Sequence, residues 1–158
     1  MRNIRVAVVG PGRVEAADES GRPRATPRSH VGAILANSVL ELAGTCEVEP
    51  AQRDRFIREW GQVAPVFYSV EALLRARPSD IACATSLAAT QVEVLARWCA
   101  AKPRAIFCGQ RIGENSGDAA EIVALSSNLH LPLAVNYRRR QDPRIRTLRS
   151  RRRCGPSS

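Results

Sequence analysis

The sequence predicts an α/β fold with a doubly wound, mostly parallel sheet between two layers of helices. Residues 4–9 form a short, β-branched and nearly all-apolar run, which is typical of a strand buried on both faces of a parallel sheet. The run ends at a Gly-Pro-Gly turn, and five further apolar runs then alternate with segments of helical periodicity. Neither an all-α nor an all-β arrangement accommodates this alternation, so we expect six parallel strands alternating with helices.

The turn after the first strand has the form of a dinucleotide-binding loop. Gly10 permits a tight turn, and Gly12 lets backbone N–H groups approach a pyrophosphate, so both positions favour a residue without a Cβ. Arg13 and Val14 follow, and we assign them to the same cofactor-binding segment. Glu15 stands at the third position of the fingerprint in place of glycine or alanine. An ordinary glycine turn after a core strand is therefore the alternative.

Local patterns predict the remaining elements. Residues 15–26 are polar and predict a surface insertion, and a helix is expected to begin near Pro27. Its apolar positions are Val31, Ile34, Leu35 and Val39. Further strands are predicted over residues 39–46, 66–68, 81–85, 104–108 and 131–137, and further helices over residues 50–61, 70–77, 91–101 and 118–125. Ser69 is predicted to cap the helix that follows it.

The ends of these strands carry the candidate ligand-binding residues, because ligands of doubly wound sheets bind outside the carboxyl ends of the strands. Glu47 follows the second strand, where a carboxylate can accept hydrogen bonds from an adenosine ribose; a solvated loop acid is the alternative. Thr85 and Ser86 follow the fourth strand, which is expected beside the first, and Gln110 follows the fifth. With the two glycines, these residues form the predicted crevice.

The net charge of +9 belongs to the C-terminal end of the chain. Residues 138–158 carry nine arginines and one acid, a balance of +8, so the other 137 residues carry +1. We interpret residues 149–158 as a basic, disordered tail. Such a tail binds polyanions non-specifically, and it lacks the aromatic residues that stack on bases. A nucleic-acid-binding protein is thus one functional hypothesis, and it rests on the terminal arginines alone.

Length and cysteine content limit the class of protein. A chain of 158 residues with 44% hydrophobic content can form one domain with one core. The five cysteines, at positions 46, 83, 99, 108 and 154, form no CxxC pair, so reduced thiols of a cytoplasmic protein are expected rather than zinc ligands or disulfides. No apolar run approaches the roughly 18 residues of a membrane span.

In the order and spacing of its motifs, the chain over residues 4–148 resembles the N-terminal domain of the Gfo/Idh/MocA family of NAD(P)-dependent sugar and inositol dehydrogenases. The segments that carry the resemblance are RVAVVGPGRV, SHVGAIL, CEVEPAQRDRF, YSVEALL, PSDIACATS, AIFCGQR and AVNYRRRQDPRI. The resemblance implies a Rossmann-like domain over residues 1–148 with NAD(P) as cofactor. NAD is favoured, because Glu47 would repel a 2′-phosphate and no arginine immediately follows it.

The sequence departs from the family pattern at parts that have functional roles in the family. Gln110 stands at the position of the family's lysine, which contacts substrate and cofactor near the hydride-transfer centre. The family's C-terminal domain, which supplies the catalytic histidine and most of the substrate pocket, has no counterpart in this sequence, as in a truncated or frame-shifted reading frame. The resemblance therefore implies an NAD(P)-binding domain without full dehydrogenase activity of its own, and no catalytic residue is assigned.

Three outcomes stay open at this point. A small-molecule substrate would bind only if a second domain or a partner completes the site. Glu15 and the insertion would oppose a pyrophosphate, so weak or lost cofactor binding is one outcome. A non-catalytic regulatory or protein-interaction module is the alternative function. In the resembling family the second domain covers the outer face of the sheet domain. A chain without that domain is expected to expose apolar surface or an open sheet edge, and so to self-associate, for example as a homo-oligomer.

Overall fold

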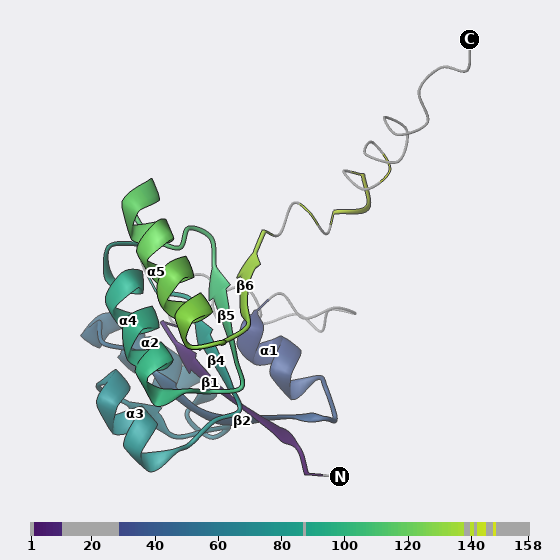
Figure 1. The fold of residues 1–158 in the computed structure, drawn as a ribbon. Coiled ribbons are helices and arrows are strands. Elements are labelled where there is room, and N and C mark those ends of the chain that lie inside the picture. The colour runs from purple at the N-terminus through teal and green to yellow at the C-terminus, as the bar shows by residue number, and fades with distance from the viewer. Residues whose placement is uncertain are drawn as a thin grey trace.

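The computed structural model describes residues 2–10, 29–86, 88–137, 140, 142–144 and 147 (Figure 1). Its strands are β1 (Ile4–Val9), β2 (Leu40–Cys46), β3 (Val66–Phe67), β4 (Ile81–Ala84), β5 (Ala105–Gly109) and β6 (Leu133–Asn136). Its helices are α1 (His30–Leu35), α2 (Pro50–Trp60), α3 (Val70–Ala76), α4 (Ala88–Ala101) and α5 (Ser116–Asn128). The predicted α/β class is confirmed.

The six strands form one parallel sheet with the order β3-β2-β1-β4-β5-β6. The chain starts in the centre, moves outward to β3, and then crosses back to place β4 against the other side of β1. Val9 at the end of β1 is in register with both Cys46 of β2 and Ala84 of β4. This reversal of strand order creates the switch point at which doubly wound sheets bind ligands. The prediction that the fourth strand lies beside the first is confirmed.

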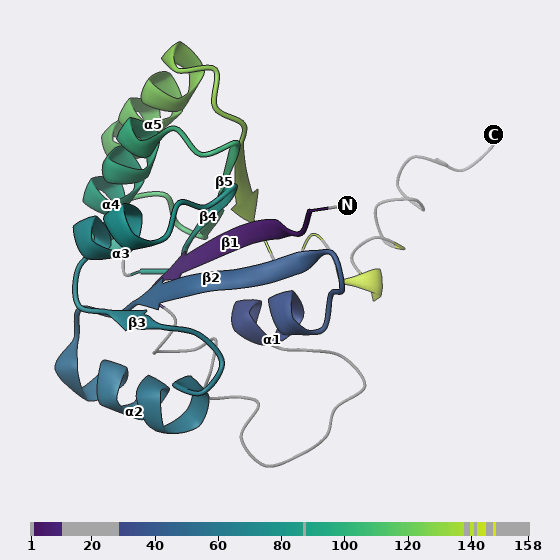
Figure 2. The ribbon, with the colours of Figure 1, turned by 90° about the horizontal axis from the view of Figure 1, so that it is seen from below.

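Helices cover both faces of the sheet, which gives three layers (Figure 2). Helices α1 and α2 lie on one face, where Val31, Ile34 and Phe56 pack with Val6 and Val8 of β1. Helices α3, α4 and α5 cover the other face; their core residues are Val70, Leu73, Val94, Leu95, Trp98, Cys99 and Ile122. Because successive residues of β1 face opposite layers, the strand is buried on both sides, as its apolar composition predicts.

Helix α1 differs most from the prediction. It begins at His30 rather than near Pro27, and Pro27 itself lies outside the described residues. Ser29 is the N-cap, and its Oγ accepts a hydrogen bond of 2.8 Å from the N–H of Gly32. The helix ends at Leu35 because a turn at Asn37 directs the chain into β2. Leu35 and Val39, predicted on the helix's apolar face, are therefore exposed.

Helices α4 and α5 are longer than predicted. Helix α4 buries Gln91, Val94, Leu95, Trp98 and Cys99, whereas Val92 and Ala96 are only half-buried. The position of α4 between α3 and α5 determines which of its residues are buried. The local sequence pattern does not contain that information. Helix α5 begins at Ser116, where Asn115 is the N-cap. Strand β6 is shorter than predicted.

The cysteines of the described residues lie in the core. Cys46, Cys83, Cys99 and Cys108 are all buried, and Cys154 lies outside the described residues. In the part of the chain that the structure describes, no cluster of three or more His, Cys, Asp or Glu side chains could hold a metal ion. No helix in that part is long and apolar enough to cross a bilayer.

Candidate functional site

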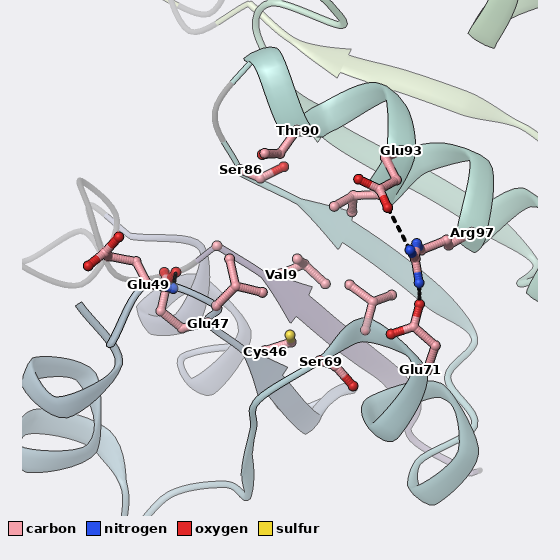
Figure 3. A pocket seen from close by; sticks show the side chains of 14 residues that line it. Val9, Cys46, Glu47, Glu49, Ser69, Glu71, Ser86, Thr90, Glu93 and Arg97 are labelled. Carbon is pink, nitrogen blue, oxygen red and sulfur yellow. Dashed lines mark hydrogen bonds and ion pairs between the residues drawn. The ribbon is translucent and has the colours of Figure 1, made fainter. Parts of the chain in front are cut away.

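A pocket of about 350 Å³ opens at the carboxyl ends of β1, β2 and β4, between α3 and α4 (Figure 3). It is lined by residues 9–10, 46–49, 69–71, 86, 90, 93–94 and 97. The pocket therefore lies at the switch point of the sheet, and residues distant in sequence meet there. Among the predicted site residues, it brings together Gly10, Glu47 and Ser86.

Gly10 ends β1 in a conformation that favours glycine. Its φ is +78°, and its N–H donates a 2.9 Å hydrogen bond to the carbonyl of Cys46. A Cβ at this position would lie 2.7 Å from the backbone nitrogen of Ser86 and 2.8 Å from its Cα. The absence of a side chain thus lets the turn after β4 approach the turn after β1. Gly12, Arg13 and Val14, which complete the predicted loop, lie outside the described residues, as does Glu15.

Thr85 and Ser86 follow β4 and have different roles. The hydroxyl of Thr85 donates to the carbonyls of Val9 and Gly10, both at 3.0 Å, so it fastens β4 to the end of β1 and does not line the pocket. Ser86 does line the pocket, and its buried Oγ has no hydrogen-bond partner among the described residues. A buried hydroxyl without a partner costs free energy, so this oxygen is a candidate to bind a ligand.

Glu47 is held at one end of the pocket. The residue is only 6% exposed, and its Oε1 accepts a 3.1 Å hydrogen bond from the N–H of Glu49. Burial and the neighbouring Glu47 carboxylate raise the pKa of the Cys46 thiol to about 12, in spite of the opposing charge of Arg53. Cys46 therefore stays neutral at physiological pH and contributes an apolar surface to the pocket.

Arg53 supports the turn that carries Glu47, a role that the sequence reasoning missed. Its Nη1 donates to the carbonyls of Glu47 and Val48, both at 3.4 Å, and its guanidinium lies 4.6 Å from the ring centroid of Tyr68. The i, i+6 spacing of these residues carries no recognised signal for such a contact. Only the packing of α2 beside β3 brings the three groups together.

The opposite end of the pocket is also charged. Arg97 of α4 contacts the carboxylates of Glu71 on α3 and Glu93 on α4, and all three residues line the pocket (Figure 3). The i, i+4 spacing of Glu93 and Arg97 is a sequence signal for the ion pair between these two residues. The participation of Glu71 depends on the contact between α3 and α4.

Gln110 is not part of this pocket. It is exposed in the turn after β5, beyond β4, and its peptide bond to Arg111 is cis. The backbone beside it is fixed by the buried Gln91, whose Nε2 donates a 3.0 Å hydrogen bond to the carbonyl of Gly109. Gln110 thus lies one strand from Ser86 at the end of β4, two from Gly10 at the end of β1 and three from Glu47 at the end of β2.

The strand order and the pocket at the switch point define the class of fold as Rossmann-like. No protein-family model matches the sequence, and no curated protein matches it. Solved structures of Gfo/Idh/MocA-type dehydrogenases do match the fold over their N-terminal part.

Three of these structures show the extent of the match. A putative myo-inositol dehydrogenase from Sinorhizobium meliloti is 21% identical with a TM-score of 0.73, and the match covers 97% of this chain and 42% of that one. The WlbA dehydrogenase from Bordetella pertussis, solved with NADH and UDP-GlcNAcA, is 19% identical with a TM-score of 0.72, covering 89% and 37%. For myo-inositol 2-dehydrogenase from Lactobacillus plantarum, the values are 14%, 0.71, 94% and 40%. The chain spans about two fifths of the length of these proteins. Structural matches at identities this low show a shared fold alone.

Proposed function

We propose that this chain is an NAD(H)-binding domain of the kind found in Gfo/Idh/MocA dehydrogenases, extending over residues 1–148. The observation that carries the proposal is the pocket at the switch point, where Gly10, Glu47 and Ser86 meet. The dehydrogenases that share the fold support it, since the structure of the WlbA enzyme contains NADH. The buried cysteines of the described residues would suit the reducing cytoplasm, the location expected from the sequence.

The residues of the pocket fit the adenosine half of the dinucleotide. The turn at Gly10, which has no room for a Cβ, would present backbone groups to the pyrophosphate. Glu47 would accept hydrogen bonds from the ribose hydroxyls, and the unpartnered Ser86 hydroxyl would bind a nearby polar atom. Val70 and Val94 line the pocket on opposing helices and offer apolar surface to a base. When bound, the nicotinamide ring supplies or accepts a hydride.

The charges of the pocket support NAD(H) over NADP(H). Glu47 and Glu49 line the same end of the pocket, and a 2′-phosphate there would be repelled. Arg97 is the cation among the described lining residues, and two carboxylates pair with it at the other end. No unpaired cation of the described lining is therefore left to neutralise a phosphate.

We further propose that the chain does not catalyse hydride transfer on its own. The exposed Gln110 can form hydrogen bonds but has no titratable proton to exchange with a substrate hydroxyl. Binding of a small-molecule substrate would then require groups from a second domain or a partner. This same observation favours the second candidate, a non-catalytic regulatory or protein-interaction module that retains the nucleotide pocket.

Titration calorimetry with NAD⁺ and NADP⁺ tests the proposal. We expect NAD⁺ to bind at least about tenfold more tightly, a difference of about 1.4 kcal/mol. The Glu47→Gln variant should lose most of this preference, because the amide removes the negative charge that repels the 2′-phosphate. Glu59→Gln, on the outer part of α2 and away from the pocket, is the matched control and should keep it. Failure of both dinucleotides to bind would overturn the proposed function, and tighter binding of NADP⁺ would overturn the role of Glu47.

A further inference from the structure

The end of the pocket opposite Glu47 is lined by an ion-paired triad that bridges two helices, with side chains that are 42% (Arg97), 44% (Glu71) and 66% (Glu93) exposed. Arg97 Nη2 lies 2.5 Å from Glu93 Oε1, and Nη1 of the same guanidinium contacts Glu71 Oε1. Figure 3 shows Glu71 reaching from α3 and Glu93 from α4 toward this one guanidinium. The guanidinium of Arg97 thus bridges the two carboxylates at the pocket wall.

This end of the pocket is suited to hydrogen-bond donors. Two carboxylates share one guanidinium, so the triad has a formal charge of −1. The contacts with Arg97 involve Oε1 of each carboxylate, and an ionised carboxylate has further lone pairs on its second oxygen. A ligand atom that donates an N–H is therefore favoured here, whereas a carbonyl or phosphate oxygen is disfavoured.

The surface beside the triad is apolar. Val70 precedes Glu71 on α3 and is 6% exposed, and Val94 follows Glu93 on α4 and is 8% exposed. The two valines line the pocket from opposing helices, next to the carboxylates. A flat aromatic ring with an amino group at one edge matches this combination, because its faces contact the valines while its edge reaches the triad.

We infer that Glu71 and Glu93, held by Arg97, recognise the exocyclic amino group of adenine and so determine the base specificity of the pocket. This inference rests on the proposed function. If the pyrophosphate lies at Gly10 and the ribose at Glu47, the base occupies the part of the pocket that remains, between Val70 and Val94. Adenine presents an amine donor at its C6 edge, and hypoxanthine presents an oxygen there.

The test compares NAD⁺ with nicotinamide hypoxanthine dinucleotide in titration calorimetry on the 158-residue chain. The two ligands differ only in the base, so the ratio of their dissociation constants cancels every contact to the ribose, pyrophosphate and nicotinamide. We expect NAD⁺ to bind about tenfold more tightly, since a hydrogen bond to a charged acceptor is replaced by repulsion between oxygens.

The double variant Glu71→Gln/Glu93→Gln removes both negative charges and keeps the size of the side chains. Its amides can donate to the hypoxanthine oxygen, so the ratio should fall to about one. Glu59→Gln is the matched control: Glu59 pairs with Arg55 at i, i+4 on α2, with a distance of 3.1 Å, and does not line the pocket. It should keep the tenfold ratio. General loosening of the double variant would weaken both ligands alike and leave the ratio unchanged.

The outcomes separate this inference from the proposed function. Equal affinities of the wild-type chain for the two dinucleotides, or an unchanged ratio in the double variant, overturn the inference and leave NAD(H) binding intact. If neither dinucleotide binds, both the inference and the proposed function are overturned. A ratio near ten in the wild type and in Glu59→Gln, with a ratio near one in the double variant, supports it.

Discussion

The Cβ that Gly10 lacks would lie 2.7 Å from the backbone nitrogen of Ser86. This contact joins the turn after β1 to the turn after β4, and these two turns form the centre of the proposed cofactor site. The neighbouring atom belongs to the backbone, so it cannot move aside as the end of a flexible side chain can. The same missing side chain therefore determines both the stability of the switch point and its access to a ligand.

Gly10→Ala should destabilise the domain by about 1–3 kcal/mol, because the new Cβ meets backbone atoms and the residue must keep a φ of +78°. Urea unfolding followed by circular dichroism measures this. Gly109→Ala is the control, since its Cβ would make only ordinary contacts, at 3.8 Å to the carbonyl oxygen of Ala84. Equal stability of Gly10→Ala and the wild-type chain would show that the turn has another conformation in solution.

Thr85→Val should lower the free energy of unfolding by about 1 kcal/mol. The substitution removes the hydroxyl that donates to the carbonyls of Val9 and Gly10 and leaves the carbonyl of Gly10 without that bond. Thr85→Ser keeps the hydroxyl and should retain most of the stability. The idea is contradicted if the serine variant is the less stable of the two in the same urea titration.

Stability should decrease as the pH rises above about 9. Burial raises the pKa of Cys46 to about 12 and that of Cys108 to about 11, against a hydrogen bond from Gln91 that lowers the latter. Between pH 9 and the folded pKa values, the unfolded chain releases these protons and the folded chain keeps them. The free energy of unfolding then falls by up to about 1.4 kcal/mol per pH unit for each thiol.

The Cys46→Ala variant isolates one of these contributions. Its absolute stability will be lower, because a buried side chain is lost, but the slope of stability against pH is the relevant quantity. Between pH 9.5 and 11, we expect a slope shallower than that of the wild-type chain by about 1 kcal/mol per pH unit. Urea titrations at several pH values measure it, and identical slopes would mean that Cys46 is not desolvated.

The 158-residue chain should not turn over sugars or inositols at a rate typical of ordinary enzymes. A positioned acid–base group contributes about 10²–10⁴-fold, and Gln110 cannot serve as one. NAD(P)H formation over a panel of sugars, inositols and their amino and keto derivatives measures this. Gln110→Lys should not restore activity by itself, since a lysine supplies no substrate pocket. Turnover above roughly 1 s⁻¹ by the wild-type chain would show that the active site is elsewhere.

Self-association through β6 is expected at high protein concentration. Among the described strands, β6 pairs only with β5, so its other edge is open, and Ala134 on it is exposed. Ala134→Lys should reduce the apparent mass in light scattering, because a charge on an edge strand opposes pairing. Ala120→Lys adds the same charge on an exposed position of α5 and should not. A monomer at every concentration tested would rule out this edge as an interface.

Local sequence patterns were sufficient for the architecture. The buried character of residues 4–9 and the alternation of apolar runs predicted six strands, and their order along the chain predicted the switch point beside β1. Ser69 was correctly predicted as a cap, because a serine oxygen that accepts from Ala72 is a contact within one turn of helix. Such features depend on neighbours in sequence, so the sequence alone contains them.

Only the tertiary structure decided which residues share the pocket. Glu47 and Ser86 line the same pocket, because both follow strands whose ends meet at one edge of the sheet. Thr85 lies at the same edge, but its hydroxyl is directed to the β1 backbone, and Gln110 lies one strand further away. Glu71 and Arg97 meet through the packing of α3 on α4, and Arg53 reaches the Glu47 turn through the placement of α2. Contacts between separate elements depend on the angle and height at which those elements pack, and these are set by the whole core rather than by any local spacing.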